Sequence, residues 1–173
     1  MSRRLEEAIR RLEKKVRKVE SITRNTSTSF VAGDITVLHS HTGDTLVAGT
    51  STSETVGPVK GQLAFMNSSK QWIKASAGNG AAGGNIHPIG IALSAAPHTD
   101  GVLALGLYKL DTSHVSGSSG TFDIGKQVFM SPETSGSFTT MIPSGSGQFV
   151  RVLGHAVDTD VIYFNPSGDF IEV

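Results

Sequence analysis

The sequence contains no cysteine, which excludes disulfide bridges, zinc–thiolate sites and thiol catalysis. It has no apolar run approaching the roughly 18 residues of a membrane-spanning helix, and no apolar signal core at its start. The arginine-rich N-terminus carries four glutamates, so a transit peptide is not expected. We therefore expect a protein that is made in a cytoplasm, uses no export signal and has no membrane partner.

Aromatic residues are few, at 6% of the 173 residues, whereas glycine is abundant with 20 copies. A chain rich in glycine, serine and threonine is expected to form many turns and short strands. The length allows one ordinary domain and an appendage. Because hydrophobic residues make up only 38% of the chain, we expect part of its apolar surface to be buried against other subunits.

The formal net charge of zero conceals two unlike segments. Residues 1–24 hold nine Lys/Arg and four Glu, whereas residues 25–173 hold six Lys/Arg and eleven Asp/Glu. The basic segment could meet an acidic surface, but basic residues beside glutamates are more typical of the solvated exterior of a coiled coil. No aromatic residues are interleaved with them, and the basic residues overlap the heptads, so we expect no specific nucleic-acid partner.

Residues 1–24 have the pattern of a coiled-coil helix. The segment 2–22 contains neither glycine nor proline, and its apolar residues are spaced by 4, 3, 4 and 3. We predict that these residues hold an oligomer together: Leu5, Ile9, Leu12, Val16 and Val19. β-Branched residues at the a positions favour a dimer, but Val19 at a d position weakens that preference, so the residues leave dimer and trimer open.

The rest of the chain predicts a mainly β protein. We assign residues 25–57 to a linker and the first strands, and residues 58–173 to a β-rich domain. Short apolar runs that alternate with glycine-rich turns indicate a β-sandwich or small barrel. The predicted strands are Ile35–Leu38, Thr45–Val47, Leu63–Met66, Trp72–Lys74, Ile89–Leu93, Val102–Leu110, Gln127–Met130, Phe138–Met141, Phe149–Val157, Val161–Phe164 and Phe170–Val173.

The domain contains an internal repeat, in which two of the matched segments share an offset of 64 residues. The matches are Gly61–Met66 with Gly125–Met130, Trp72 with Phe138, and Ile89–Leu93 with Leu153–Val157. The last pair carries Gly90 and Gly154, and glycine inside a strand is typical of a close approach between backbones. The pattern predicts two copies of one β-unit.

No catalytic motif is present. The sequence has no phosphate-binding Gly-Lys-Ser/Thr motif after a predicted strand and no nucleophile elbow before a helix. Asp158 and Asp160 would share one face of an extended segment, but a polar turn before the strand Val161–Phe164 is the more common structure for such a pair. We therefore expect a protein that is not an enzyme.

His39 and His41 are the sharpest candidates for a binding site. In a strand, residues i and i+2 point to the same side. On a threefold axis, three copies would place six imidazoles around one point, which is an octahedral arrangement suited to a transition metal. The alternative is a pair of solvent-facing histidines beside the predicted turn at Gly43 and Asp44. We expect no other cofactor.

Several motifs of the β-rich domain carry a resemblance to a known family. They are Gly61-Gln-Leu-Ala-Phe, Trp72, Ile89–Ala96, Gly125–Ser131, Pro143–Gly147, Phe149–Ala156 and Val161–Gly168. With these motifs, the stretch from Gly57 to Val173 resembles virion proteins of tailed bacteriophages. The family includes capsid decoration (cement) proteins, head fibres and related tail-fibre modules.

The resemblance implies a virion structural protein that binds the major capsid protein or another virion protein. It also implies a homotrimer, and trimeric phage fibres use His-Xaa-His sequences to bind metal. The alternative is a tail-fibre or adhesin module that binds host cell-surface glycan through exposed residues such as Trp72, Tyr108 or Asp169. Trp72 has a second interpretation as a core residue, because Phe138 occupies the matching position of the repeat.

Overall fold

The computed structural model describes residues 41–54, 56–78, 88–117 and 120–173, all of which belong to one compact unit. Strands make up 41% of these residues and helices 6%, which confirms the prediction of a mainly β protein. The predicted coiled-coil helix lies outside the described residues. In the part that the structure does describe, no helix has the length and hydrophobicity needed to cross a membrane.

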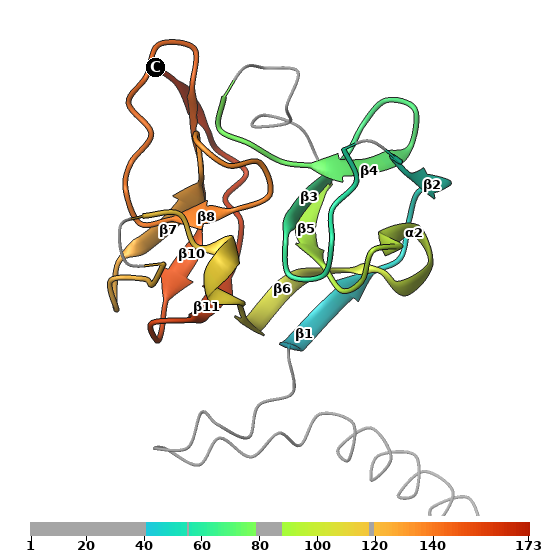
Figure 1. The fold of residues 1–173 in the computed structure, drawn as a ribbon, viewed down its shortest axis with the longest axis horizontal. Coiled ribbons are helices and arrows are strands. Elements are labelled where there is room, and N and C mark those ends of the chain that lie inside the picture. The colour runs from blue at the N-terminus through green and yellow to red at the C-terminus, as the bar shows by residue number, and fades with distance from the viewer. Residues whose placement is uncertain (1–40, 55, 79–87, 118–119) are drawn as a thin grey trace, which may run out of the picture. The chain divides into compact units, whose positions relative to one another are not determined.

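The described residues form short strands joined by tight turns (Figure 1). The strands are β1 His41–Leu46, β2 Ser51–Thr52, β3 Leu63–Met66, β4 Gln71–Lys74, β5 Ile89–Ala92, β6 Val102–Lys109, β7 Gln127–Met130, β8 Phe138–Thr139, β9 Phe149–Val150, β10 Val152–Ala156, β11 Val161–Phe164 and β12 Ile171–Glu172. Two single turns of helix accompany them, α2 at Pro97–Asp100 and a 3-10 turn at Thr112–His114. The bounds of β3, β7 and β11 agree with the prediction, whereas β2 and α2 were not predicted.

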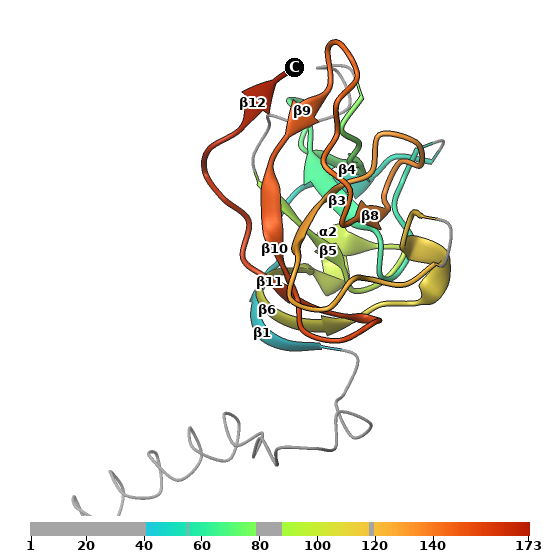
Figure 2. The ribbon, with the colours of Figure 1, turned by 90° about the vertical axis from the view of Figure 1, so that its left-hand side faces the viewer.

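One sheet contains ten of the strands, in the order β2-β4-β3-β5-β6-β11-β10-β7-β8, with β1 paired to β6. Strands β9 and β12 form a separate antiparallel pair beside the C-terminus (Figure 2). Because β1 and β2 pair with β6 and β4, the residues from His41 onward are part of the same sheet as the rest of the domain.

The strand pairing repeats along the chain. The pairs β3·β4, β3·β5 and β5·β6 are matched by β7·β8, β7·β10 and β10·β11. The amide of Gly61 donates to the Ala92 carbonyl at 2.8 Å, and the amide of Gly125 donates to the Ala156 carbonyl at 2.8 Å. Since both bonds are related by the same offset of 64 residues that the sequence motifs share, the predicted repeat is confirmed at the level of hydrogen bonds.

Strand β6 belongs to both repeats. Its first half pairs with β5, its second half pairs with β11, and β1 pairs along most of its length. Leu46 is the partner of Val102 in the first repeat, and Tyr108 is the partner of Ile162 in the second. The second half of β6 is therefore the first strand of the second repeat, as β1 is the first strand of the first repeat. Figure 1 shows the two groups of strands on either side of β6.

The two repeats share one hydrophobic core. Its fully buried members include Leu63 and Ile91 from the first repeat and Met130 and Leu153 from the second. A smaller cluster around Trp72 packs against the residues that follow β1. Because the core is continuous and β6 is shared, the repeats are expected to fold as one unit.

Glycines permit close approaches between strands of the sheet. A Cβ atom on Gly154 would collide with the carbonyl oxygen of Tyr163, and one on Gly90 would lie 2.8 Å from the carbonyl oxygen of Leu103. Gly154 also has a positive φ of 147°, a conformation that other residues rarely adopt. The predicted close approach at Gly90 and Gly154 is confirmed.

Candidate functional site

The predicted oligomerisation residues Leu5, Ile9, Leu12, Val16 and Val19 lie outside the described residues, and so does His39. His41 is described: it is half-buried at the start of β1, and its ring stacks on that of Tyr108 with centroids 6.3 Å apart and an interplanar angle of 16°. Within the described ranges, no group of three or more histidine or carboxylate side chains is placed to hold a metal ion. The metal site at His39 and His41 requires several copies of the chain and stays a prediction.

Asp158 and Asp160 have different partners. The carboxylate of Asp158 accepts a 2.7 Å hydrogen bond from the amide of Thr159. Asp160 forms an ion pair with Lys109 at 3.2 Å. The interpretation of this segment as a polar turn before β11 is confirmed, because one carboxylate shapes the turn and the other pairs with the neighbouring strand.

Two of the residues suggested for glycan binding are buried. Trp72 is 0% exposed and its indole N–H donates to the carbonyl oxygen of Ala48 at 2.6 Å, while Tyr108 is 2% exposed. Neither ring can stack on a sugar at the surface, so the expectation that they are exposed binding residues is wrong. The interpretation of Trp72 as a core residue is confirmed, and its counterpart Phe138 is buried as well. Asp169 is exposed.

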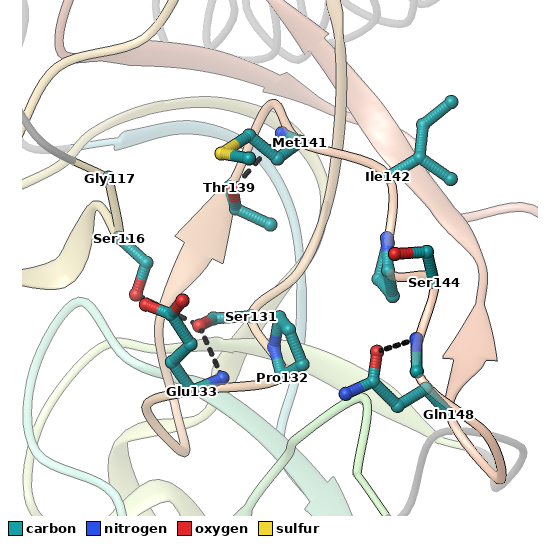
Figure 3. Close-up of a pocket in the computed structure, with 12 residues that line it drawn as sticks. Ser116, Gly117, Ser131, Pro132, Glu133, Thr139, Met141, Ile142, Ser144 and Gln148 are labelled. Carbon is teal, nitrogen blue, oxygen red and sulfur yellow. Dashed lines mark hydrogen bonds between the residues drawn. The ribbon is translucent and has the colours of Figure 1, made fainter.

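A cavity of about 650 Å³ opens at the ends of β7 and β8 (Figure 3). Its walls come from four places in the chain: residues 116–117, residues 131–133, residues 139 and 141–145, and Gln148. One isolated bridge brings the first and third of these segments together, since Val115 pairs with Phe138, and a second bridge pairs Gln148 with Gly78. The cavity is therefore a product of long-range pairing.

The floor of this cavity is organised around Ser131, which is fully buried. Its hydroxyl oxygen accepts hydrogen bonds of 3.1 Å from the amides of Glu133 and Thr134, and the hydroxyl donates to Ser116 Oγ at 2.9 Å. A serine nucleophile needs a general base within hydrogen-bond reach, and none of the described histidines lines the cavity. The hydrogen bonds of Ser131 stabilise the turn after β7.

The rim combines apolar side chains with polar groups. Met141 and Ile142 are 72% and 65% exposed, and the amide of Met141 donates to Thr139 Oγ1 at 3.0 Å. The predicted strand Phe138–Met141 is two residues too long, because this side-chain hydrogen bond turns the backbone after Thr139. On the opposite side, the backbone amide of Gly145 donates to Gln148 Oε1 at 2.9 Å. This bond uses the oxygen of the Gln148 side chain and leaves its Nε2 as a donor.

The lining of the cavity is largely uncharged. Among the described residues, Glu133 is the single charged one that lines it. Exposed apolar side chains beside satisfied polar turns are a common feature of protein interfaces. No family model, curated protein or solved structure matches this chain.

Proposed function

We propose that this chain is a non-enzymatic structural protein of a tailed-phage particle, a trimeric capsid decoration (cement) protein or head fibre. In this proposal, residues 1–24 form a coiled coil through the heptad core described above, and the repeats form a β-sandwich or small barrel. The protein is made in the host cytoplasm and is incorporated into the virion. Its partner is the major capsid protein or another virion protein.

The observation that carries the proposal is a set of exposed apolar side chains on the loop after β8 and on the C-terminal segment. We call it the apolar end, and its residues are Met141, Ile142, Phe170, Ile171 and Val173. The C-terminal strand joins the rim of the cavity, since Val173 accepts a hydrogen bond from the amide of Gly147 and donates one of 2.9 Å to Gln148. A cluster of exposed apolar side chains is a common feature of a surface that binds another protein.

The mechanism is avidity. One contact through the apolar end is weak, but three copies on one trimer bind together with a much greater apparent affinity. A trimer also matches the symmetry of a threefold position on a capsid, so that every subunit makes the same contact. The turns beside the apolar end hold it in one shape, which limits the entropy lost on binding.

The test is co-sedimentation of the full-length protein with capsids of the phage whose genome encodes it. The wild type is expected to be a trimer by light scattering and to saturate the capsid sites. Ile142→Ser is expected to remain a trimer and to bind at least about tenfold more weakly. Ile124→Ser is the matched control, because Ile124 is 62% exposed but does not belong to the apolar end. Wild-type protein that does not sediment with capsids would contradict the proposal.

A host-recognition module that binds cell-surface glycan is the second candidate. The hydroxyl, amide and carboxylate groups around the 650 Å³ cavity are of the kind that bind sugar hydroxyls. The burial of Trp72 and Tyr108 removes the rings that would stack on a sugar. Binding of the full-length protein to host cells, lost in Glu133→Gln and Gln148→Ala but retained in Ile124→Ser, would favour this candidate over the first.

A further inference from the structure

A second cavity, of about 350 Å³, lies between the turn that precedes β3 and the 3-10 turn that follows β6. Its lining includes Lys60 and Gly61 from the first turn, Tyr108 and Lys109 from β6, and His114. We propose that this cavity binds a small oxyanion. The proposal concerns a site separate from the apolar end and does not depend on the function proposed above.

Two polar groups meet in this cavity, and one of them has no hydrogen-bond partner. Nδ1 of His114 is the one buried side-chain nitrogen or oxygen without a hydrogen bond in the part of the chain that the structure describes. Tyr108 also lines the cavity. The position that a Cβ atom of Gly61 would occupy is 2.9 Å from His114 Nδ1 and 3.4 Å from the Tyr108 oxygen. Buried polar groups are nearly always satisfied, so a ligand that bonds to His114 Nδ1 would offset the cost of leaving that nitrogen unpaired.

A comparison of the two repeats shows that a glycine turn alone does not create such a cavity. Gly61 and Gly125 occupy equivalent turns and have similar φ angles of 86° and 82°. A Cβ atom on Gly125 would have no heavy atom within 4 Å, whereas one on Gly61 would fall between His114 and Tyr108. The turn requires glycine in both repeats, but only in the first does the glycine face a pair of polar side chains.

The charge around the cavity favours an anion. The described residues include ten Asp/Glu and six Lys/Arg, and three of those six cations gather here. Lys60 and Lys109 line the cavity, and Lys74 on β4 is close enough to act on His114. The carboxylate of Asp111 is held by the amide of Ser113 at 2.9 Å.

Two carboxylates offset part of this charge, because Asp111 lines the cavity and Asp160 pairs with Lys109 at 3.2 Å. The three lysines and the two carboxylates together leave one net positive charge around the cavity, whereas the described part of the domain is acidic as a whole. Phosphate, sulfate and carboxylate groups share the chemistry that this site offers, which is hydrogen bonding to an ammonium, a phenol and an imidazole.

The direction of the pH dependence follows from His114. Burial lowers the pKa of His114, Asp111 opposes that shift, and Lys74 adds to it. A bound oxyanion would stabilise the protonated imidazole and raise this pKa. We therefore expect the oxyanion to bind more tightly as the pH falls. The charged or titratable groups around the His114 ring are Asp111, Lys74, Tyr108, Lys60 and the Lys109–Asp160 pair.

The test is an NMR titration of the histidine ring signals of the full-length protein with inorganic phosphate at constant ionic strength. The His114 signal, assigned by its loss in His114→Gln, is expected to shift saturably with a dissociation constant in the millimolar range or below. Lys60→Gln and Tyr108→Phe each remove one donor and are expected to weaken binding about tenfold. Lys126→Gln is the matched control, because Lys126 is an exposed lysine paired with Asp123 at 3.0 Å, away from the cavity.

Absence of a saturable shift of His114 would overturn the proposal, and so would an equal loss in Lys60→Gln and Lys126→Gln, which would indicate only non-specific charge screening. Parallel titrations with sulfate and acetate distinguish the source of the anion, since tighter binding of acetate would indicate a carboxylate. If Tyr108→Phe does not fold, as judged by its circular dichroism spectrum, Lys60→Gln alone decides the outcome, because Lys60 is exposed and its loss does not disturb the core.

Discussion

Gly154→Ala tests whether the two repeats unfold together. Gly154 lies on β10 at a φ of 147°, and an added Cβ atom would collide with the carbonyl oxygen of Tyr163 on β11. A non-glycine residue in such a conformation costs about 1–3 kcal/mol. The strands must also move apart, and each weakened hydrogen bond between β10 and β11 costs about 0.5–1.5 kcal/mol. We expect a total loss of about 3–5 kcal/mol in the free energy of unfolding.

Two further substitutions separate strain from collision. Gly125→Ala meets no heavy atom within 4 Å, so it carries only the cost of its positive φ of 82°, about 1–2 kcal/mol. Gly168→Ala has neither a positive φ nor a close neighbour, and it is expected to be neutral or to stabilise by up to about 1 kcal/mol. The free energy of unfolding should therefore be highest for Gly168→Ala, lower for Gly125→Ala and lowest for Gly154→Ala.

Trp72 provides the readout. It is the single tryptophan of the chain, it is fully buried, and it lies on β4 in the first repeat, whereas Gly154 lies in the second. In urea unfolding followed by tryptophan fluorescence, Gly154→Ala is expected to lower the midpoint seen by Trp72, because β6 and the core join the repeats. An unchanged Trp72 midpoint, with a separate earlier transition in circular dichroism, would refute the reasoning that the repeats form one cooperative unit.

Three other substitutions give simpler outcomes. Lys70 has a left-handed φ of 59°, so Lys70→Gly is expected to range from neutral to a stabilisation of about 1 kcal/mol in urea unfolding, because relief of strain is offset by greater freedom of the unfolded chain. Trp72→Phe removes the 2.6 Å hydrogen bond to Ala48 and should destabilise the domain by at least about 1–3 kcal/mol, measured by circular dichroism. Burial lowers the pKa of His114 below its usual 6.5, so the unfolded chain binds the proton at a higher pH than the folded chain does. The free energy of unfolding should therefore fall as the pH drops below 6.5. In urea unfolding measured over a range of pH, His114→Gln should reduce this dependence.

The sequence predicts strands well where local pattern and flanking turns agree. Strands β3 and β7 each follow a glycine turn and contain an apolar run of the right length, and their bounds match the prediction. Strand β2 was missed because Ser51 and Thr52 are polar and are held by parallel pairing with Gln71 and Trp72, which no local pattern records. The repeat was predictable because its equivalent hydrogen bonds depend on residues that recur in the sequence.

The cavities could not be predicted, since each depends on residues that meet only in three dimensions. Gly61 and His114 are far apart in the sequence, and neither has a neighbour that marks it as part of a site. Met141 and Ile142 carried a weak signal, because two adjacent apolar residues before Pro143 do not alternate as a strand does. Their exposure depends on the hydrogen bond to Thr139, which the sequence pattern does not reveal.

The two repeats differ at corresponding ends of the same scaffold. The turn before the first strand holds a polar cavity in the first repeat, at Gly61, whereas its equivalent at Gly125 is open. The loop after the second strand carries exposed Met141 and Ile142 in the second repeat. Because no residue of the polar cavity belongs to the apolar end, substitutions in them should act independently. Lys60→Gln is expected to reduce phosphate binding without affecting capsid attachment. Ile142→Ser is expected to reduce capsid attachment without affecting phosphate binding.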